Sequence, residues 1–139
     1  MATEEIVYLS YAEAVAYHIE LMWYWGEMNF GVFSRHLIES ALARPQQAAT
    51  WENADLARQA ATLCFGLIKN HPWIGGNKRT ATFLVERFLN LNGSEITAAA
   101  SEILELVHAI EADLWNIDRI DLWTREHTQK TYMPPSGAD

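Results

Sequence analysis

The chain has 139 residues, half of them hydrophobic and 20% charged, a size and composition that predict one domain with a single core over residues 1–132. Its ten basic and 18 acidic residues give a formal net charge of −8, which excludes the broad basic face of a general nucleic-acid binder. No uninterrupted apolar stretch approaches the roughly 18 residues that a membrane span needs, so we expect neither a nucleic-acid partner nor a membrane.

The N-terminus reads "MATEEIVYLS", with acidic residues where a secretory signal carries cations and without a long apolar segment. The one cysteine, Cys64, cannot form an internal disulfide, and its place in the apolar run "LCFGLI" indicates a small buried side chain. Both features favour a cytoplasmic protein.

Two helices are predicted in the first third of the chain. The sequence "SYAE" at 10–13 has the capping-box pattern and predicts a helix over 11–25. Ser34 predicts the start of a second helix, which should end before Pro45 because proline disfavours helical geometry in its predecessor. We therefore expect residues 44–52 to be a connection.

Three aromatic residues, Trp23, Tyr24 and Trp25, are consecutive near the end of the first predicted helix. Because each residue of a helix turns by about 100°, the three cannot all face one core. We expect mainly core positions with at least one ring near the surface. The alternative is an exposed patch that binds a partner protein or a second protomer.

The rest of the chain is also predicted to be helical. Asn53 is the expected N-cap of a largely buried helix, and Gly93 supplies a stop signal later in the chain. The predicted helices lie at 54–70, 77–91, 97–111 and 118–130. No alternating segment rich in valine or isoleucine predicts a strand, and the tail "MPPSGAD" at 133–139 is expected to be disordered. The predicted fold class is all-α, with five to six helices.

Residues 71–81, "HPWIGGNKRTA", combine features that suit an anion. The two glycines let backbone N–H groups approach a ligand, and the helix that follows presents free N–H groups and the positive end of its dipole. Arg79 can add a bidentate contact to phosphate, Lys78 a point charge, and Asn77 can cap the helix or position the ligand. A diphosphate or triphosphate is the expected guest.

His71 stands on the other side of the same loop, where its imidazole can accept a proton near neutral pH. A Gly-Gly turn, a histidine at a helix end and a Lys-Arg pair each have ordinary structural explanations. Cations at a helix N-terminus are electrostatically unfavourable, however, so an arriving anion explains Lys78 and Arg79 better than helix stability does.

The stretch "HPWIGGNKRTA" resembles the signature H-x-F-x-[D/E]-[G/A]-N-[G/K]-R of Fic/Doc proteins, and its lysine at position 78 is similar to the Doc branch. The segments "LIESALARPQQ" and "LVERFLNLNG" also resemble Doc-type sequences, so the resemblance covers about residues 8–93. It implies a Fic-fold toxin that transfers part of a nucleotide to a protein hydroxyl, with the phosphate of ATP and a threonine of elongation factor Tu as the expected donor and acceptor. It also implies a cognate antitoxin.

The same resemblance implies roles for individual residues. His71 would be the general base, and Asn77, Lys78 and Arg79 would handle the phosphates of ATP, with the backbone of Gly75 and Gly76 in the anion-binding turn. Residues 44–52 would be a flap that holds the target segment as an added strand.

Two positions depart from the family pattern. Trp73 replaces the usual phenylalanine, and Gly75 replaces the Asp or Glu that binds magnesium. We therefore expect magnesium to be weakly held, with no protein side chain as a predicted ligand, and Gly75→Asp to strengthen its binding.

Protein adenylylation and a catalytically silent nucleotide- or protein-binding module are the alternatives to phosphotransfer. A single E-x-x-H, Glu105 and His108, lacks the second copy that a di-iron bundle needs.

Overall fold

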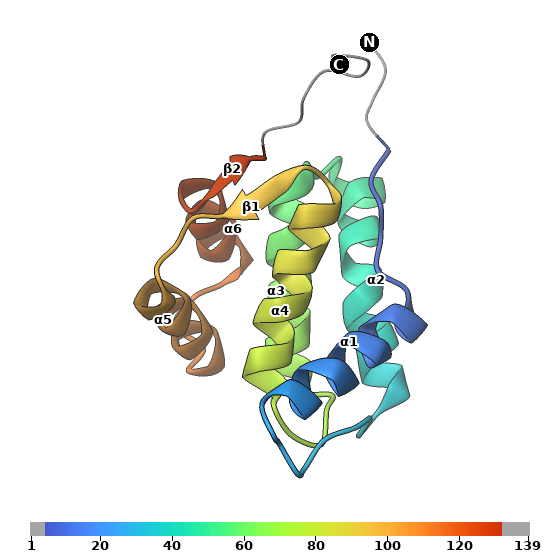
Figure 1. Cartoon of the computed structure of the whole chain (residues 1–139). Helices are drawn as coiled ribbons and strands as arrows, with labels where there is room; N and C mark the ends of the chain where they lie inside the picture. Colours follow the sequence, from blue (N-terminus) through green and yellow to red (C-terminus); the bar gives the residue numbers. More distant parts are fainter. Residues whose placement is uncertain (1–4, 132–139) are drawn as a thin grey trace, which may run out of the picture.

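The computed structural model describes residues 5–131, which form six α-helices and one two-stranded sheet (Figure 1). The helices are α1 (Tyr11–Tyr24), α2 (Arg35–Glu52), α3 (Leu56–Asn70), α4 (Asn77–Leu91), α5 (Ala100–Glu111) and α6 (Ile117–Glu126). The strands are β1 (Ser94–Ile96) and β2 (Thr128–Lys130). The all-α fold class is confirmed, and the tail predicted at 133–139 lies outside the described residues. Within 5–131 no helix has both the length and the apolar character required to cross a membrane.

Helix α3 is the centre of the core. It runs beside α4 in the middle of the molecule (Figure 1) and packs against α2, α4, α5 and α6. Small side chains allow this close packing: a Cβ on Gly66 would lie 3.3 Å from the Cα of Ala41 in α2. Cys64 is buried as predicted, and burial raises the pKa of its thiol to about 12.

Helix α2 differs from the prediction because it continues through Pro45 to Glu52. The predicted connection, and the flap, at 44–52 are therefore wrong. Proline cannot donate to the carbonyl four residues earlier, yet Ile38, Ala41, Pro45 and Ala48 form one buried stripe against α3. Burial of this apolar stripe offsets the local cost of the proline.

The helix boundaries near residues 53–55 also differ from the prediction. Asn53 has a left-handed conformation (φ 54°) and ends α2, whereas the Asp55 carboxylate accepts a hydrogen bond from the Arg58 N–H and caps α3. Asparagine and aspartate are both found at helix N-caps and at helix ends, so the sequence pattern predicted Asn53 as the N-cap of α3 where the structure has Asp55.

The C-terminal region contains a small sheet that was not predicted. Strands β1 and β2 are antiparallel, with Glu95 opposite Gln129. The sheet uses residues expected at the end of the last helix, and it delays the start of α5 because the Thr97 N–H donates to the His127 carbonyl at 2.7 Å. Each strand has three residues, which is too short to give a sequence periodicity.

The aromatic run at the end of α1 is exposed. The side chains of Trp23 and Tyr24 are 82% and 78% exposed, and that of Trp25 is 56% exposed. The expectation of mainly core positions is therefore wrong. The core side of α1 is formed instead by residues one turn apart, Ala14, His18 and Met22.

His18 is fully buried and connects four parts of the chain. The Gly31 N–H donates to its Nε2 at 2.9 Å, so Nδ1 carries the proton and donates to the Thr80 hydroxyl in α4 at 2.8 Å. Its ring also stacks on Trp73, with 4.2 Å between centroids. His18 thereby joins α1, the segment after it, the loop before α4 and α4 itself.

We predict that His18 makes folding sensitive to mild acid. Burial lowers its pKa from 6.5 to about 4, so between these values the unfolded chain binds a proton that the folded chain does not. The stability that neutral His18 contributes to the folded state is fully present above its unfolded pKa and decreases as the pH is lowered. At about pH 5 the free energy of unfolding is smaller by roughly 2 kcal/mol. Urea unfolding from about pH 7 to pH 5 measures this loss. His18→Gln, which cannot titrate, should show a flatter pH dependence, and equal slopes for the two proteins would contradict the prediction.

Candidate active site

The loop between α3 and α4 is held in place by the segment that follows α1. The N–H groups of Phe33 and Ser34 donate to the Pro72 carbonyl at 3.0 and 3.1 Å, and the Ile74 N–H donates to the Gly31 carbonyl at 2.9 Å. An isolated antiparallel bridge pairs Val32 with Trp73. The element beside the loop is therefore residues 25–34, which lie at the same end of the molecule in Figure 1.

Asn77 closes the loop from inside. Its side-chain oxygen accepts a hydrogen bond from the Trp73 N–H at 2.9 Å, and its amide donates to the Trp73 carbonyl at 2.8 Å. Both residues are buried. Asn77 therefore holds the shape of the loop, and the first-turn N–H groups of α4 receive no side-chain cap because Gly76 is the N-cap.

All six predicted site residues line one cavity of about 560 Å³. They are His71, Gly75, Gly76, Asn77, Lys78 and Arg79, and the other lining residues are Glu27, Ile74, Thr82, Ile103, Leu104 and Val107. The volume lies in the range of small-molecule sites. We call this space the phosphate cavity, after the ligand proposed for it below. The structure thus brings the histidine, the glycines and the two cations to one place, as the sequence predicts.

The two cations have weak partners that a ligand can displace. The Lys78 ammonium lies 3.2 Å from a Glu111 oxygen in α5, and the Lys78 side chain is 61% exposed. The Arg79 guanidinium lies 4.4 Å from the centroid of the Trp25 ring. Exposed ion pairs and cation–π contacts each contribute about 1 kcal/mol or less. His71 is exposed at the C-terminal end of α3.

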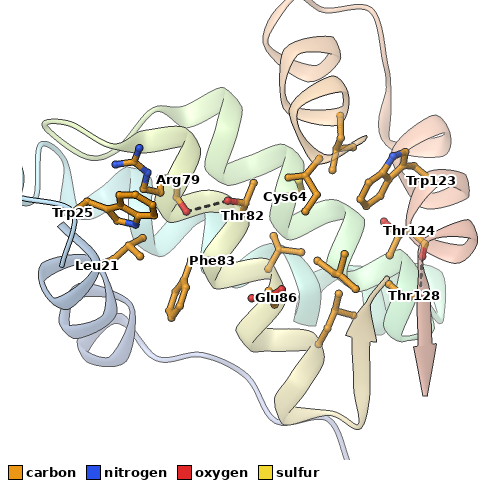
Figure 2. Close-up of a pocket in the computed structure, with 15 residues that line it drawn as sticks. Leu21, Trp25, Cys64, Arg79, Thr82, Phe83, Glu86, Trp123, Thr124 and Thr128 are labelled. Carbon is orange, nitrogen blue, oxygen red and sulfur yellow. Dashed lines mark hydrogen bonds between the residues drawn. The ribbon is translucent and has the colours of Figure 1, made fainter. Parts of the chain in front are cut away.

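A second cavity of about 290 Å³ is mainly apolar and extends from α1 across α4 toward α6 (Figure 2). Trp25 and Arg79 lie together at one end of it, and Cys64 and Trp123 line its interior. We call it the apolar cavity. Arg79 lines both cavities together with Thr82 and Ile103, and it is the one charged residue of these three.

Gly75 is required by close packing. A Cβ at this position would lie 2.2 Å from the carbonyl oxygen of Asn29, a backbone atom that cannot move away as a flexible side chain does. An aspartate introduced here would meet the same backbone oxygen, so the predicted gain in magnesium binding by Gly75→Asp requires the Asn29 segment to shift. Neither Asn29 nor Glu27, which also lies at the site, carries a motif that the sequence analysis could have detected.

Two comparisons bear on this site. A family model described as the Fic/DOC family matches residues 8–89, which include the whole loop. The chain is also similar to Toxin Doc of Mycolicibacterium smegmatis (strain ATCC 700084 / mc(2)155), with 34% identity over 88 residues that represent 58% of this chain and 68% of the relative. The chain belongs to the Fic/DOC family. Within it, the chain groups with the Doc toxin branch, as the lysine at position 78 indicated.

In this Fic/DOC chain the signature loop depends on the segment 25–34 for its geometry. The loop's backbone bonds, the Trp73–His18 stack and the close approach at Gly75 all involve that segment or the helix before it. Sequence motifs locate the chemistry of the loop, whereas the packing beneath it comes from residues outside the motif.

We predict that Gly75→Ala destabilises the folded chain by about 1–3 kcal/mol, since the added methyl group overlaps the Asn29 backbone. Urea unfolding measures this change. Ile74→Ala is the matched control, because it alters an exposed neighbour in the same loop and should change stability by less than about 0.5 kcal/mol. If Gly75→Ala is as stable as Ile74→Ala, the loop tolerates a side chain at position 75.

Proposed function

We propose that the chain is a Doc-type toxin of the cytoplasm that transfers the γ-phosphate of ATP to a hydroxyl of a target protein. The observation that carries this proposal is the single cavity shared by His71, two cations and the uncapped N-terminus of α4. A helix N-terminus with Lys78 and Arg79 attracts phosphate oxygens, and a neutral imidazole nearby can accept a proton.

The transfer can be written with the residues of this cavity. His71 removes the proton from the target hydroxyl, whose oxygen attacks the γ-phosphorus, and the bond to the bridging oxygen breaks so that ADP leaves. Lys78, Arg79 and the N–H groups of α4 compensate the negative charge on the phosphates. Asn77 keeps these groups in place through its two bonds to Trp73. The two cations give up only weak contacts when they bind phosphate.

Phosphotransfer is favoured over adenylylation because Lys78 replaces the glycine found in adenylylating relatives. A threonine of elongation factor Tu is the acceptor that the Doc resemblance suggests.

Magnesium that enters with ATP would contribute charge neutralisation, and Gly75 offers it no side-chain oxygen. A silent nucleotide- or protein-binding module is the alternative that this glycine leaves open.

We predict that radiolabel from γ-labelled ATP, and not from α-labelled ATP, reaches a protein of a cell extract.

His71→Ala should abolish transfer and retain ATP binding, because its imidazole serves as base. Arg79→Ala should weaken ATP binding by about 1.5–3 kcal/mol, the usual contribution of a charged hydrogen bond. Calorimetry and labelling on the same preparations separate the two roles. Transfer of the α label would show adenylylation, and binding without any transfer would show a silent module.

We also propose that a cognate antitoxin covers the aromatic surface at the end of α1. This surface combines exposed apolar side chains from α1 and the segment after it. They are Trp23, Tyr24, Trp25, Met28 and Phe33. Contiguous exposed apolar patches mark protein-interaction sites, and tryptophan and tyrosine are enriched among the residues that dominate binding.

We predict that Trp23→Ala weakens antitoxin affinity at least tenfold, since truncation of a dominant interface aromatic costs about 2 kcal/mol or more. Trp51→Ala is the control, because Trp51 is equally exposed, at 84% against 82%, and lies at the far end of α2. Titration of the purified antitoxin measures both variants. Equal losses, or no loss in either, would place the interface elsewhere.

A further inference from the structure

The phosphate cavity contains one carboxylate among its lining residues, and it does not come from the signature loop. Glu27 lines the cavity together with Gly75, Gly76, Lys78 and Arg79. We propose that Glu27 supplies the carboxylate that binds a divalent cation together with the phosphates of ATP. This inference rests on the proposed function.

The same packing that removes an acid from position 75 brings Glu27 to the site. The Asn29 carbonyl occupies the space of a Cβ on Gly75, so no side chain can project from there without displacing the segment. Two residues earlier, Glu27 reaches the cavity wall. The same backbone path therefore excludes a side chain at position 75 and places the Glu27 carboxylate at the cavity.

The backbone around Glu27 is held by specific contacts. The Glu27 N–H donates to the Met22 carbonyl at 2.9 Å, and Gly26 adopts φ 67°, which lets the chain turn directly after α1. On the other side, Gly31 is bonded to His18 and to Ile74. Glu27 is thus presented from a segment anchored at both ends.

The cations that line the cavity have other partners, so the Glu27 carboxylate is available to bind a metal ion. Within residues 5–131, Lys78 forms its ion pair with Glu111 and Arg79 contacts Trp25, and no cation lies within ion-pair distance of Glu27. The described residues also contain no group of three acidic, histidine or cysteine side chains that could hold a metal by themselves. Magnesium commonly binds through one or two carboxylates with substrate phosphates. One carboxylate fits a cation that arrives with ATP and is held by both.

The experiment measures ATP affinity by calorimetry with magnesium and with a chelator, for the parent chain, Glu27→Gln and Glu20→Gln. Glutamine has the size of glutamate, and Glu27 is exposed, so the fold is retained. Glu20 is an exposed acid on α1 that lines neither the phosphate cavity nor the apolar cavity. We expect magnesium to tighten ATP binding by roughly tenfold in the parent and in Glu20→Gln, and to have no effect in Glu27→Gln. Without metal, Glu27→Gln should bind ATP as tightly as the parent or more tightly, because a negative charge beside the phosphates is removed.

A second readout uses manganese in place of magnesium and compares the electron spin resonance spectrum of manganese with ATP in the presence and in the absence of each protein, so that chelation by ATP alone is subtracted. Manganese should bind the parent only when ATP is present, and Glu27→Gln should lose this binding. If Glu27→Gln keeps the metal effect, or if the parent binds ATP without any metal effect, the role of Glu27 is overturned while the proposed function stands. If the parent binds no ATP under either condition, the proposed function fails and this inference fails with it.

Discussion

The geometry of the site depends on the contacts that the buried His18 imidazole makes. With one nitrogen it accepts the Gly31 N–H, with the other it donates to Thr80, and its face lies on Trp73. A neutral imidazole can accept with one ring nitrogen and donate with the other. Asn77 then completes the arrangement from the other side of Trp73. The signature loop is therefore held between two polar side chains, Asn77 within the motif and His18 on α1, which lies 55 positions before Trp73 in the chain.

Much of the fold follows from local signals. Helix α1 begins at the predicted capping box, and α4 begins and ends as the glycines and apolar spacing indicate. The errors arise where tertiary packing overrides a local preference. Pro45 lies inside a helix because its stripe packs on α3, and the three-residue strands form because two distant segments meet. A single sequence carries no signal for such long-range contacts.

The site was predictable to the extent that its chemistry is concentrated in one motif. The six residues expected at the site line one cavity because they are close in sequence and a turn followed by a helix brings them together. The environment of the motif was not predictable. Glu27, Asn29 and His18 lie in or before the segment after α1, and their effect depends on how that segment crosses the loop. Substitution of the motif's acid by glycine has its explanation in this crossing, which only three-dimensional coordinates show.

The position of Arg79 links the two cavities thermodynamically. Its guanidinium rests on Trp25 beside the apolar cavity, and the same residue lines the phosphate cavity. If ATP binds Arg79 as proposed, a partner that stabilises the Arg79–Trp25 contact lowers the affinity for ATP, and reciprocity requires ATP to lower the affinity for that partner by the same factor. A contact of about 1 kcal/mol sets the scale of this coupling at roughly fivefold. The cellular concentration of nucleotide would then influence how firmly the protein is restrained, without any direct contact between nucleotide and partner.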